Sequence, residues 1–183
     1  LSEESGTLKA GTYDLSTGLG YDEVIAQLRE GPPIHYITLT IPEGFTVDQI
    51  AARVEEKTGI PAEDFLALAK TGAKQFDHGL LASNPTDSLE GYQFPKTYRV
   101  KVGSNARDII GLMLRQFEKE MSGVDLTYAA GRNLTLHDVV TIASMIERET
   151  KVAQDRPLVS SVIYNRLSKG MLLEIDATVQ YVV

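Results

Sequence analysis

Cysteine is absent from this 183-residue sequence, which excludes a disulfide framework, a thiolate metal site and a cysteine nucleophile. No apolar stretch is long enough to cross a bilayer, and no signal peptide is visible. The first residue is leucine and not methionine, so we expect that upstream sequence has been removed. Three scattered histidines, His35, His78 and His137, lack the spacing of metal ligands, and we expect neither a metal nor a cofactor.

Basic residues are also in deficit. Lysine and arginine number 18 against 25 acidic residues, which gives a formal net charge of −7. Nucleic acids and anionic membrane surfaces require basic patches, so we expect neither as a partner. The chain is 43% hydrophobic and 23% charged, which is enough for a real core in one domain or two small ones.

The first part of the chain, residues 1–80, contains a weak internal repeat. GYDEVIAQL, from Gly20, resembles TVDQIAARV, from Thr46, and each segment follows a strand-like run, at residues 12–15 and 37–41. These patterns predict small strand–helix units.

Start and stop signals mark two helices in this part. Thr46 is able to cap the amide of Gln49 while the Gln49 side chain reaches back, and Gly59 predicts the end of that helix. A further helix is predicted from Pro61 to Gly72. Residues 72–88 are rich in small and polar side chains, which indicates a loop or linker.

The second half of the chain predicts three helices. The first has apolar residues at helical spacing behind Ser104, the predicted cap. The second begins at Thr135 and has Asp138 in its first turn. The third has Pro157 near its start and Gly170 just past its end.

Glu147 lies on the second of these helices, where about 100° of rotation per residue puts it within the apolar stripe. Glu149 lies at the margin of the stripe or outside it. A carboxylate on an apolar face costs free energy unless it is paired, hydrogen-bonded or protonated. Two interpretations stay open, a general acid and a structural bridge to Arg156 or Arg166. The predicted stripe consists of Leu136, Val139, Val140, Ala143 and Ile146.

Three stretches of the chain have distinctive motifs. ASMIERET, from Ala143, is followed by RPLVSSVIYNRLSKGMLLEIDATVQY, and LEGYQFPKTYRV begins at Leu89. These motifs resemble signatures of the YceG-like (MltG) family of endolytic murein transglycosylases. TIPEGFTVDQIAARV, from Thr40, is similar to the LysM-like segment of the family. The three stretches keep the order of the family and are spread over most of the chain.

The fold expected from these patterns and this resemblance is α+β. A LysM-like strand–helix module is predicted for residues 1–80. A mainly helical catalytic domain with a few strands is predicted for residues 81–183. Because the family continues beyond the last segment of this sequence, we expect that domain to be truncated at its C-terminus.

The resemblance implies an enzyme held in the bacterial cell membrane by a single N-terminal helix, absent here, with the present region extracytoplasmic. Such an enzyme cuts nascent peptidoglycan strands between N-acetylmuramic acid and N-acetylglucosamine, leaves 1,6-anhydro-muramyl ends and helps to terminate strand elongation. Peptidoglycan strands are the implied substrate, and peptidoglycan synthases are candidate partners. The alternative is a non-catalytic protein that binds or scaffolds cell-wall glycan and retains the motif for structure.

In the family the catalytic acid is the glutamate of the ASxxE pattern, which is Glu147 here. Ordinary glycosidases use two carboxylates, whereas a lytic transglycosylase manages with one. The acid protonates the glycosidic oxygen, and the resulting carboxylate then removes the proton of the sugar's own 6-hydroxyl, so that no water is consumed. A carboxyl group kept protonated in an apolar pocket suits this role.

Further residues are candidate ligands of the glycan. Glu90 and Tyr92, in a Gly-containing loop, either hold sugar hydroxyls or form a turn with a packed tyrosine. Asn165 and its neighbour Arg166 either face the cleft or cap the last carbonyls of their helix. The last candidates alternate on a strand-like segment, so they share one face of it. The resemblance favours an orientation of that face towards the cleft. These candidates are Asp176, Thr178 and Gln180.

Overall fold

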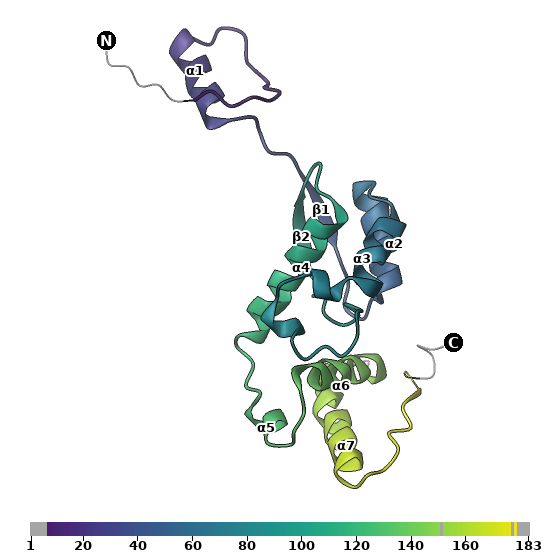
Figure 1. The fold of residues 1–183 in the computed structure, drawn as a ribbon. Coiled ribbons are helices and arrows are strands. Elements are labelled where there is room, and N and C mark those ends of the chain that lie inside the picture. Colours follow the sequence, from purple (N-terminus) through teal and green to yellow (C-terminus); the bar gives the residue numbers. More distant parts are fainter. Residues whose placement is uncertain (1–6, 151, 177, 179–183) are drawn as a thin grey trace.

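The structure, a computed structural model, describes residues 7–150, 152–176 and 178. The described chain is α+β, as predicted, with most of its residues in helices and a single two-stranded sheet (Figure 1). The elements are α1 (Tyr21–Glu30), β1 (Tyr36–Thr40), α2 (Val47–Thr58), α3 (Ala62–Thr71), η1 (Ala73–Gln75), η2 (Gly79–Leu81), β2 (Thr97–Lys101), α4 (Ala106–Met121), α5 (Thr127–Ala130), α6 (Leu136–Glu149), η3 (Ala153–Asp155) and α7 (Arg156–Ser168).

The N-terminal helix α1 stands apart from the other elements in Figure 1, and none of its residues is buried. The chain before it folds back on the helix, because the Lys9 N–H donates to the Leu28 carbonyl at 2.9 Å and the Tyr13 hydroxyl donates to the same carbonyl at 3.3 Å. The strand predicted at residues 12–15 is therefore wrong. That segment pairs with no strand in the described chain and forms an irregular loop.

The sheet joins two strands that are far apart in the sequence. β1 and β2 run antiparallel, with Tyr36 opposite Lys101 and Thr40 opposite Thr97. Alternate residues face the core, where Leu39, Tyr98 and Val100 are buried, and the other face of the sheet is exposed. Because α2 and α3 lie between the strands in the sequence, the element order of this unit is β-α-α-β.

Helix ends follow the predicted local signals closely. The Thr46 hydroxyl accepts from the Gln49 N–H and the Gln49 side chain accepts from the Thr46 N–H, which forms a capping box. Gly59 ends α2 in the left-handed conformation, with φ of 74°. The cap of α4 is Asn105 and not Ser104, because the Asn105 side chain accepts the Asp108 N–H at 3.0 Å.

One hydrophobic core crosses the boundary that we predicted at residue 80. It contains Leu39 of β1, Val54 of α2 and Phe65 of α3 together with Leu89 and Ile109, and it extends to Val140 of α6. The strand pairing also crosses residue 80. The two predicted segments therefore do not have separate cores, because burial of β1, α2 and α3 depends on β2 and α4.

A second, smaller core lies between α6 and α7. Its buried members are Ile142 and Met145 of α6, Ile163 of α7 and Ile175 of the following segment. The Arg166 guanidinium holds this segment against α7 through the Leu172 and Leu173 carbonyls and the Glu174 carboxylate. The helices α6 and α7, which cross at a wide angle in Figure 1, thus form one packed unit with the segment that follows α7.

Candidate active site around Glu147

Glu147 lies near the C-terminal end of α6, where the start of α7 comes close to it. Its Oε2 is 3.0 Å from a terminal nitrogen of Arg156, the first residue of α7. The side chains of Glu147 and Arg156 are 35% and 46% exposed. Of the two interpretations offered by the sequence, the bridge to Arg156 is therefore present in this structure.

The apolar stripe predicted for α6 is only partly correct. Val140 is buried in the first core, but Ala143 is exposed, whereas Ile142 and Met145 are buried against α7 although they lie outside the stripe. The reason is that α6 packs against the first core near Val140 and against α7 further along, whereas a single apolar stripe assumes one packing partner. Glu147 thus lies at the edge of the buried surface, and its carboxylate is not enclosed by apolar side chains.

The exposure of this ion pair limits its strength. Pairs of exposed charges contribute roughly 0–1 kcal/mol, because water screens them and ordering the side chains costs entropy. Little free energy is therefore needed to separate the Glu147 and Arg156 side chains.

The loop that begins at Leu89 docks on the first half of α6. Gly91 has φ of +84°, and a Cβ at this position would lie 3.0 Å from Val140 Cγ1. The Tyr92 hydroxyl is 2.9 Å from His137 Nδ1, and the His137 N–H donates to the Ser83 hydroxyl at 3.2 Å. The loop therefore contacts the first half of the helix whose second half contains the ASMIERET stretch.

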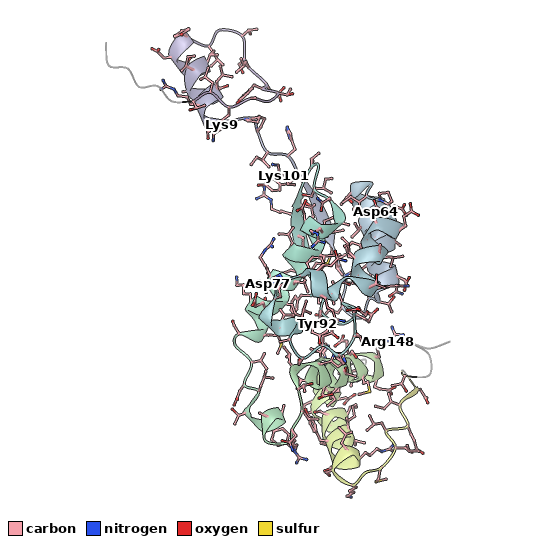
Figure 2. The ribbon with its side chains drawn as sticks, viewed as in Figure 1. Lys9, Asp64, Asp77, Tyr92, Lys101 and Arg148 are labelled. Atoms are coloured by element: carbon pink, nitrogen blue, oxygen red, sulfur yellow. The ribbon has the colours of Figure 1, made fainter. Side chains whose placement is uncertain are left out.

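Val140, against which the loop docks, lies on the same side of α6 as Glu147. Val140 and Glu147 are seven residues apart, which is about two turns or 10 Å along the helix. Figure 2 shows Tyr92 beside α6 and Arg148 at the C-terminal end of the same helix. The surface of α6 between the loop and Glu147 is our candidate functional site.

Tyr92 itself belongs to the core and does not line a cleft. Its side chain is 0% exposed, and its ring lies 5.7 Å from that of Phe117. Burial, followed by the nearby Asp138 carboxylate, raises the pKa of the Tyr92 phenol. The packed-tyrosine alternative describes the position of Tyr92 in this structure, and contact of Tyr92 with sugar hydroxyls stays a prediction.

Glu90 also has a structural use. Its carboxylate oxygens accept the Val47 N–H at 3.1 and 3.3 Å, at the first residue of α2. A carboxylate at a helix N-terminus satisfies an orphan donor and complements the helix dipole. Glu90 thereby ties its loop to α2.

The candidates on α7 and beyond it lie in several places. Asn165 is exposed and nine residues after Arg156, about 14 Å along the axis of α7. Asp176 is exposed, next to the buried Ile175. The Thr178 N–H and hydroxyl both donate to the Ile175 carbonyl, at 3.1 and 2.7 Å, in a helical turn. The strand predicted for Asp176 and Thr178 is therefore wrong, and Gln180 lies outside the described residues.

The structure thus brings Glu147 together with Arg156 and leaves the other candidates dispersed. Among the described residues, no hydrogen bond or ion pair links Glu147 to Asn165, Asp176 or Thr178. Within the same ranges, no three side chains of the metal-ligating types cluster. Nor does any helix of the described chain combine the length and hydropathy that a bilayer span requires.

Sequence reasoning missed the contact between Gly91 and Val140. The signal that could have revealed it is the glycine at the turn, because a position that needs a positive φ and a close neighbour tolerates no side chain. The contact still required knowledge of which helix would cover the loop.

Comparisons with known proteins agree on one family. The sequence profile described as the YceG-like family matches residues 1–183. A protein of Streptococcus pneumoniae serotype 2, strain D39, named endolytic murein transglycosylase, is 35% identical over 198 residues, which cover 95% of this chain and 35% of that protein. A protein of the same name from Bacillus subtilis strain 168 is 31% identical, with 94% and 51% covered.

A solved structure also has this fold. The 2.6 Å crystal structure of a yceG-like protein from Listeria monocytogenes matches with a TM-score of 0.68 and 31% identity, over 96% of this chain and 61% of that one. The chain spans between about a third and about half of the length of the curated relatives described above.

Proposed function

The chain belongs to the YceG-like family, and from that premise we propose that it is the glutamate-bearing part of an endolytic murein transglycosylase. The observation that carries the proposal is the position of Glu147. It lies within the ASxxE signature, accessible at the end of α6 and about two turns from the docked loop that begins at Leu89. A glycan strand lying along this side of α6 would pass both signature stretches.

In the proposed reaction the Glu147 carboxyl donates its proton to the glycosidic oxygen between N-acetylmuramic acid and N-acetylglucosamine. The bond from C1 to that oxygen breaks, and the oxygen leaves as a hydroxyl group. The Glu147 carboxylate then takes the proton of the muramyl 6-hydroxyl, whose oxygen bonds to C1 and forms the 1,6-anhydro ring. Atoms balance without water, and one side chain serves as acid and then as base.

Arg156 suits the state of the site after Glu147 has donated its proton better than the state before donation. A guanidinium beside the carboxylate stabilises the charge that Glu147 acquires when it gives up its proton. Before that step the cation must lie away from the carboxyl group, and the weakness of an exposed pair permits such movement.

The setting of the protein follows from the same premise. We propose that an N-terminal membrane helix precedes this region, that the region acts outside the cytoplasm, and that peptidoglycan synthases are its partners. The β-α-α-β unit formed by β1, α2, α3 and β2 is proposed as the LysM-like, glycan-binding part. The reaction as written uses neither a metal nor a cofactor.

Substitution of the carboxyl group tests the mechanism. In the full-length protein we expect Glu147→Gln to keep the fold and abolish strand cleavage, because the amide is nearly isosteric but donates no proton of comparable acidity. Glu149→Gln is the matched control, since it removes the same charge two residues away from an exposed position. Equal losses in the two variants, or cleavage by Glu147→Gln at the wild-type rate, would contradict the assignment.

The product gives an independent test. Intramolecular capture yields anhydro-muramyl ends, which are lighter by one water than hydrolytic ends, and mass spectrometry of digested strands distinguishes the two. Reducing muramic ends as the main product would make the enzyme a hydrolase and would require a second carboxylate, with Asp176 or Glu90 as the first candidates.

One observation favours a second function, that of a non-catalytic glycan-binding or scaffold protein. The carboxylate of Glu147 is engaged by Arg156, as a purely structural bridge would be. In that case the full-length protein binds glycan without shortening it, and Glu147→Gln changes stability by no more than about 1 kcal/mol. Digestion of glycan by the full-length protein decides between the two functions.

A further inference from the structure

A groove of about 450 Å³ lies far from Glu147, between the exposed face of the sheet, η1 and the outer side of α4. No residue of α6 or α7 lines it. Figure 2 labels two of its residues, Lys101 at the end of β2 and Asp77 lower down beside α4, whereas Arg148 marks α6 at the other end of the body. The groove is therefore separate from the candidate active site.

The groove is basic although the protein is acidic. Four cationic side chains line it, those of Arg99, Lys101, Arg107 and Arg115, against two carboxylates, those of Asp77 and Asp108, which leaves 4 − 2 = +2 in a chain of net charge −7. The Asp108 carboxylate is also occupied, because it accepts the Asn105 N–H at 3.0 Å in the cap of α4.

None of these four cations forms an ion pair with a carboxylate within the described ranges. Elsewhere in those ranges lysines and arginines pair with acidic side chains, as Lys70 does with Asp48 at 2.8 Å. Positive charges that converge in a concavity without carboxylate partners raise the local concentration of anions. The groove is thus suited to a ligand that carries negative charge.

Two of the arginines are held in fixed orientations by aromatic rings. The Arg99 guanidinium carbon lies 4.4 Å from the centre of the Tyr36 ring, and that of Arg107 lies 4.9 Å from the centre of the Phe76 ring. Arg107 also donates to the Gln75 carbonyl at 3.1 Å and to the Gln75 side-chain oxygen at 2.6 Å. A guanidinium stacked by its face keeps its edge N–H groups in one plane, which matches the two oxygens of a carboxylate or phosphate.

Arg115 is positioned by a glycine one turn earlier. A Cβ at Gly111 would lie 3.2 Å from an Arg115 terminal nitrogen, so the guanidinium lies against the bare backbone of α4. The three arginines therefore come from the sheet and from two positions along one helix, and all face the same concavity.

We propose that this groove binds the carboxylate-bearing stem peptide of a murein strand. The inference rests on the proposed function, which makes murein the substrate. Neutral sugar rings do not require four cations, and a long polyanion would be repelled by the negative remainder of the protein. A concave site of this volume suits a short chain better than a flat membrane surface, and its net charge of +2 matches one or two carboxylates.

The test measures binding without cleavage. The protein is the full-length Glu147→Gln variant, and the probe is a fluorescein-labelled murein stem peptide with free carboxylates, followed by fluorescence anisotropy. We expect amidation of the peptide carboxylates to weaken binding by about tenfold or more. Arg115→Gln should weaken it by about tenfold, and Arg115→Lys should retain part of the affinity, because lysine keeps the charge but loses the planar fork.

Lys119→Gln is the matched control, because Lys119 lies one turn further along α4, is exposed and does not line the groove. It should change the dissociation constant by less than about twofold. Affinity that is unaffected by amidation, or equal losses in Arg115→Gln and Lys119→Gln, would overturn the inference. So would equal competition by inorganic phosphate or by phosphatidylglycerol vesicles, which would assign the groove to another anion.

Failure of the groove assignment is distinguishable from failure of the proposed function. A wild-type protein that cleaves strands while the variant does not bind the peptide defeats only the groove assignment. A protein that binds the peptide through Arg115 but never cleaves strands supports the groove and defeats the transglycosylase.

Discussion

Substitution of Tyr92 by phenylalanine separates a packing role from a role in substrate binding. The change removes one oxygen from a side chain that is 0% exposed and leaves its ring against Phe117. The lost contact is the hydrogen bond of 2.9 Å between the hydroxyl and His137 Nδ1. Because His137 is only partly buried, water can replace the bond, and we expect a cost of about 0.5–1.5 kcal/mol.

For a chain of this length such a cost lowers the melting temperature by about 2–4 °C per kcal/mol. Urea denaturation and thermal melting measure this loss of stability. Strand cleavage by the same full-length preparation measures the activity. Tyr92→Ala is the reference for lost packing and should cost about 3–5 kcal/mol. We expect Tyr92→Phe to cleave strands within about threefold of wild type, because loss of one hydroxyl bond changes the docking of the loop only slightly.

The opposite pattern would refute this reasoning. If Tyr92→Phe melts like the wild type but loses about a hundredfold in cleavage, the phenol acts on the substrate. The residue would then have to leave the core during catalysis, and the interpretation of the loop as a docked, static element would fail.

Gly91→Ala should destabilise the protein by about 1–3 kcal/mol, from backbone strain at a positive φ together with the close approach of Val140. Gly103 has a similar φ of +85° and no atom within 4 Å of the added Cβ, so Gly103→Ala should show only the cost of backbone strain. Equal melting temperatures would exclude a contribution from the Val140 contact. Gln93→Met should be neutral or raise the urea midpoint, since the buried Gln93 amide atoms have no partner within the described chain. Because burial raises the pKa of Tyr92 and of Tyr98, stability should fall as pH rises above about 10, where unfolded phenols ionise first; urea midpoints at pH 8 and 11 check it.

Local signals in the sequence predicted the ends of helices well. The Thr46 and Gln49 box and the corresponding pair of Thr135 and Asp138 at α6 both form as side-chain bonds to nearby backbone. Gly59 ends α2 for an equally local reason, its positive φ. Such features depend on a few neighbouring residues, so that the sequence contains the whole cause.

Features that depend on distant partners were not predictable in the same way. Alternation in β1 indicated a strand, but its partner β2 is separated from it by two helices and a long loop. The short run at residues 12–15 has comparable local character and forms no strand in the described chain, since no partner lies beside it. A strand requires a second strand, and pairing over long separations is not encoded in local propensity.

The environment of Glu147 shows the same limit at the candidate site. The sequence placed Glu147 correctly on α6, but the exposure of its carboxylate depends on how α7 docks and where Arg156 lies. The bridge and the general acid were posed as alternatives, yet an exposed pair worth at most about 1 kcal/mol excludes neither. Under the proposed function, a pair that weak lets Glu147 hold Arg156 in the free protein and meet the glycosidic oxygen when a strand lies along α6. The accessibility that contradicts a buried acid is then, under the same proposal, the property that lets a polymeric substrate reach the carboxylate.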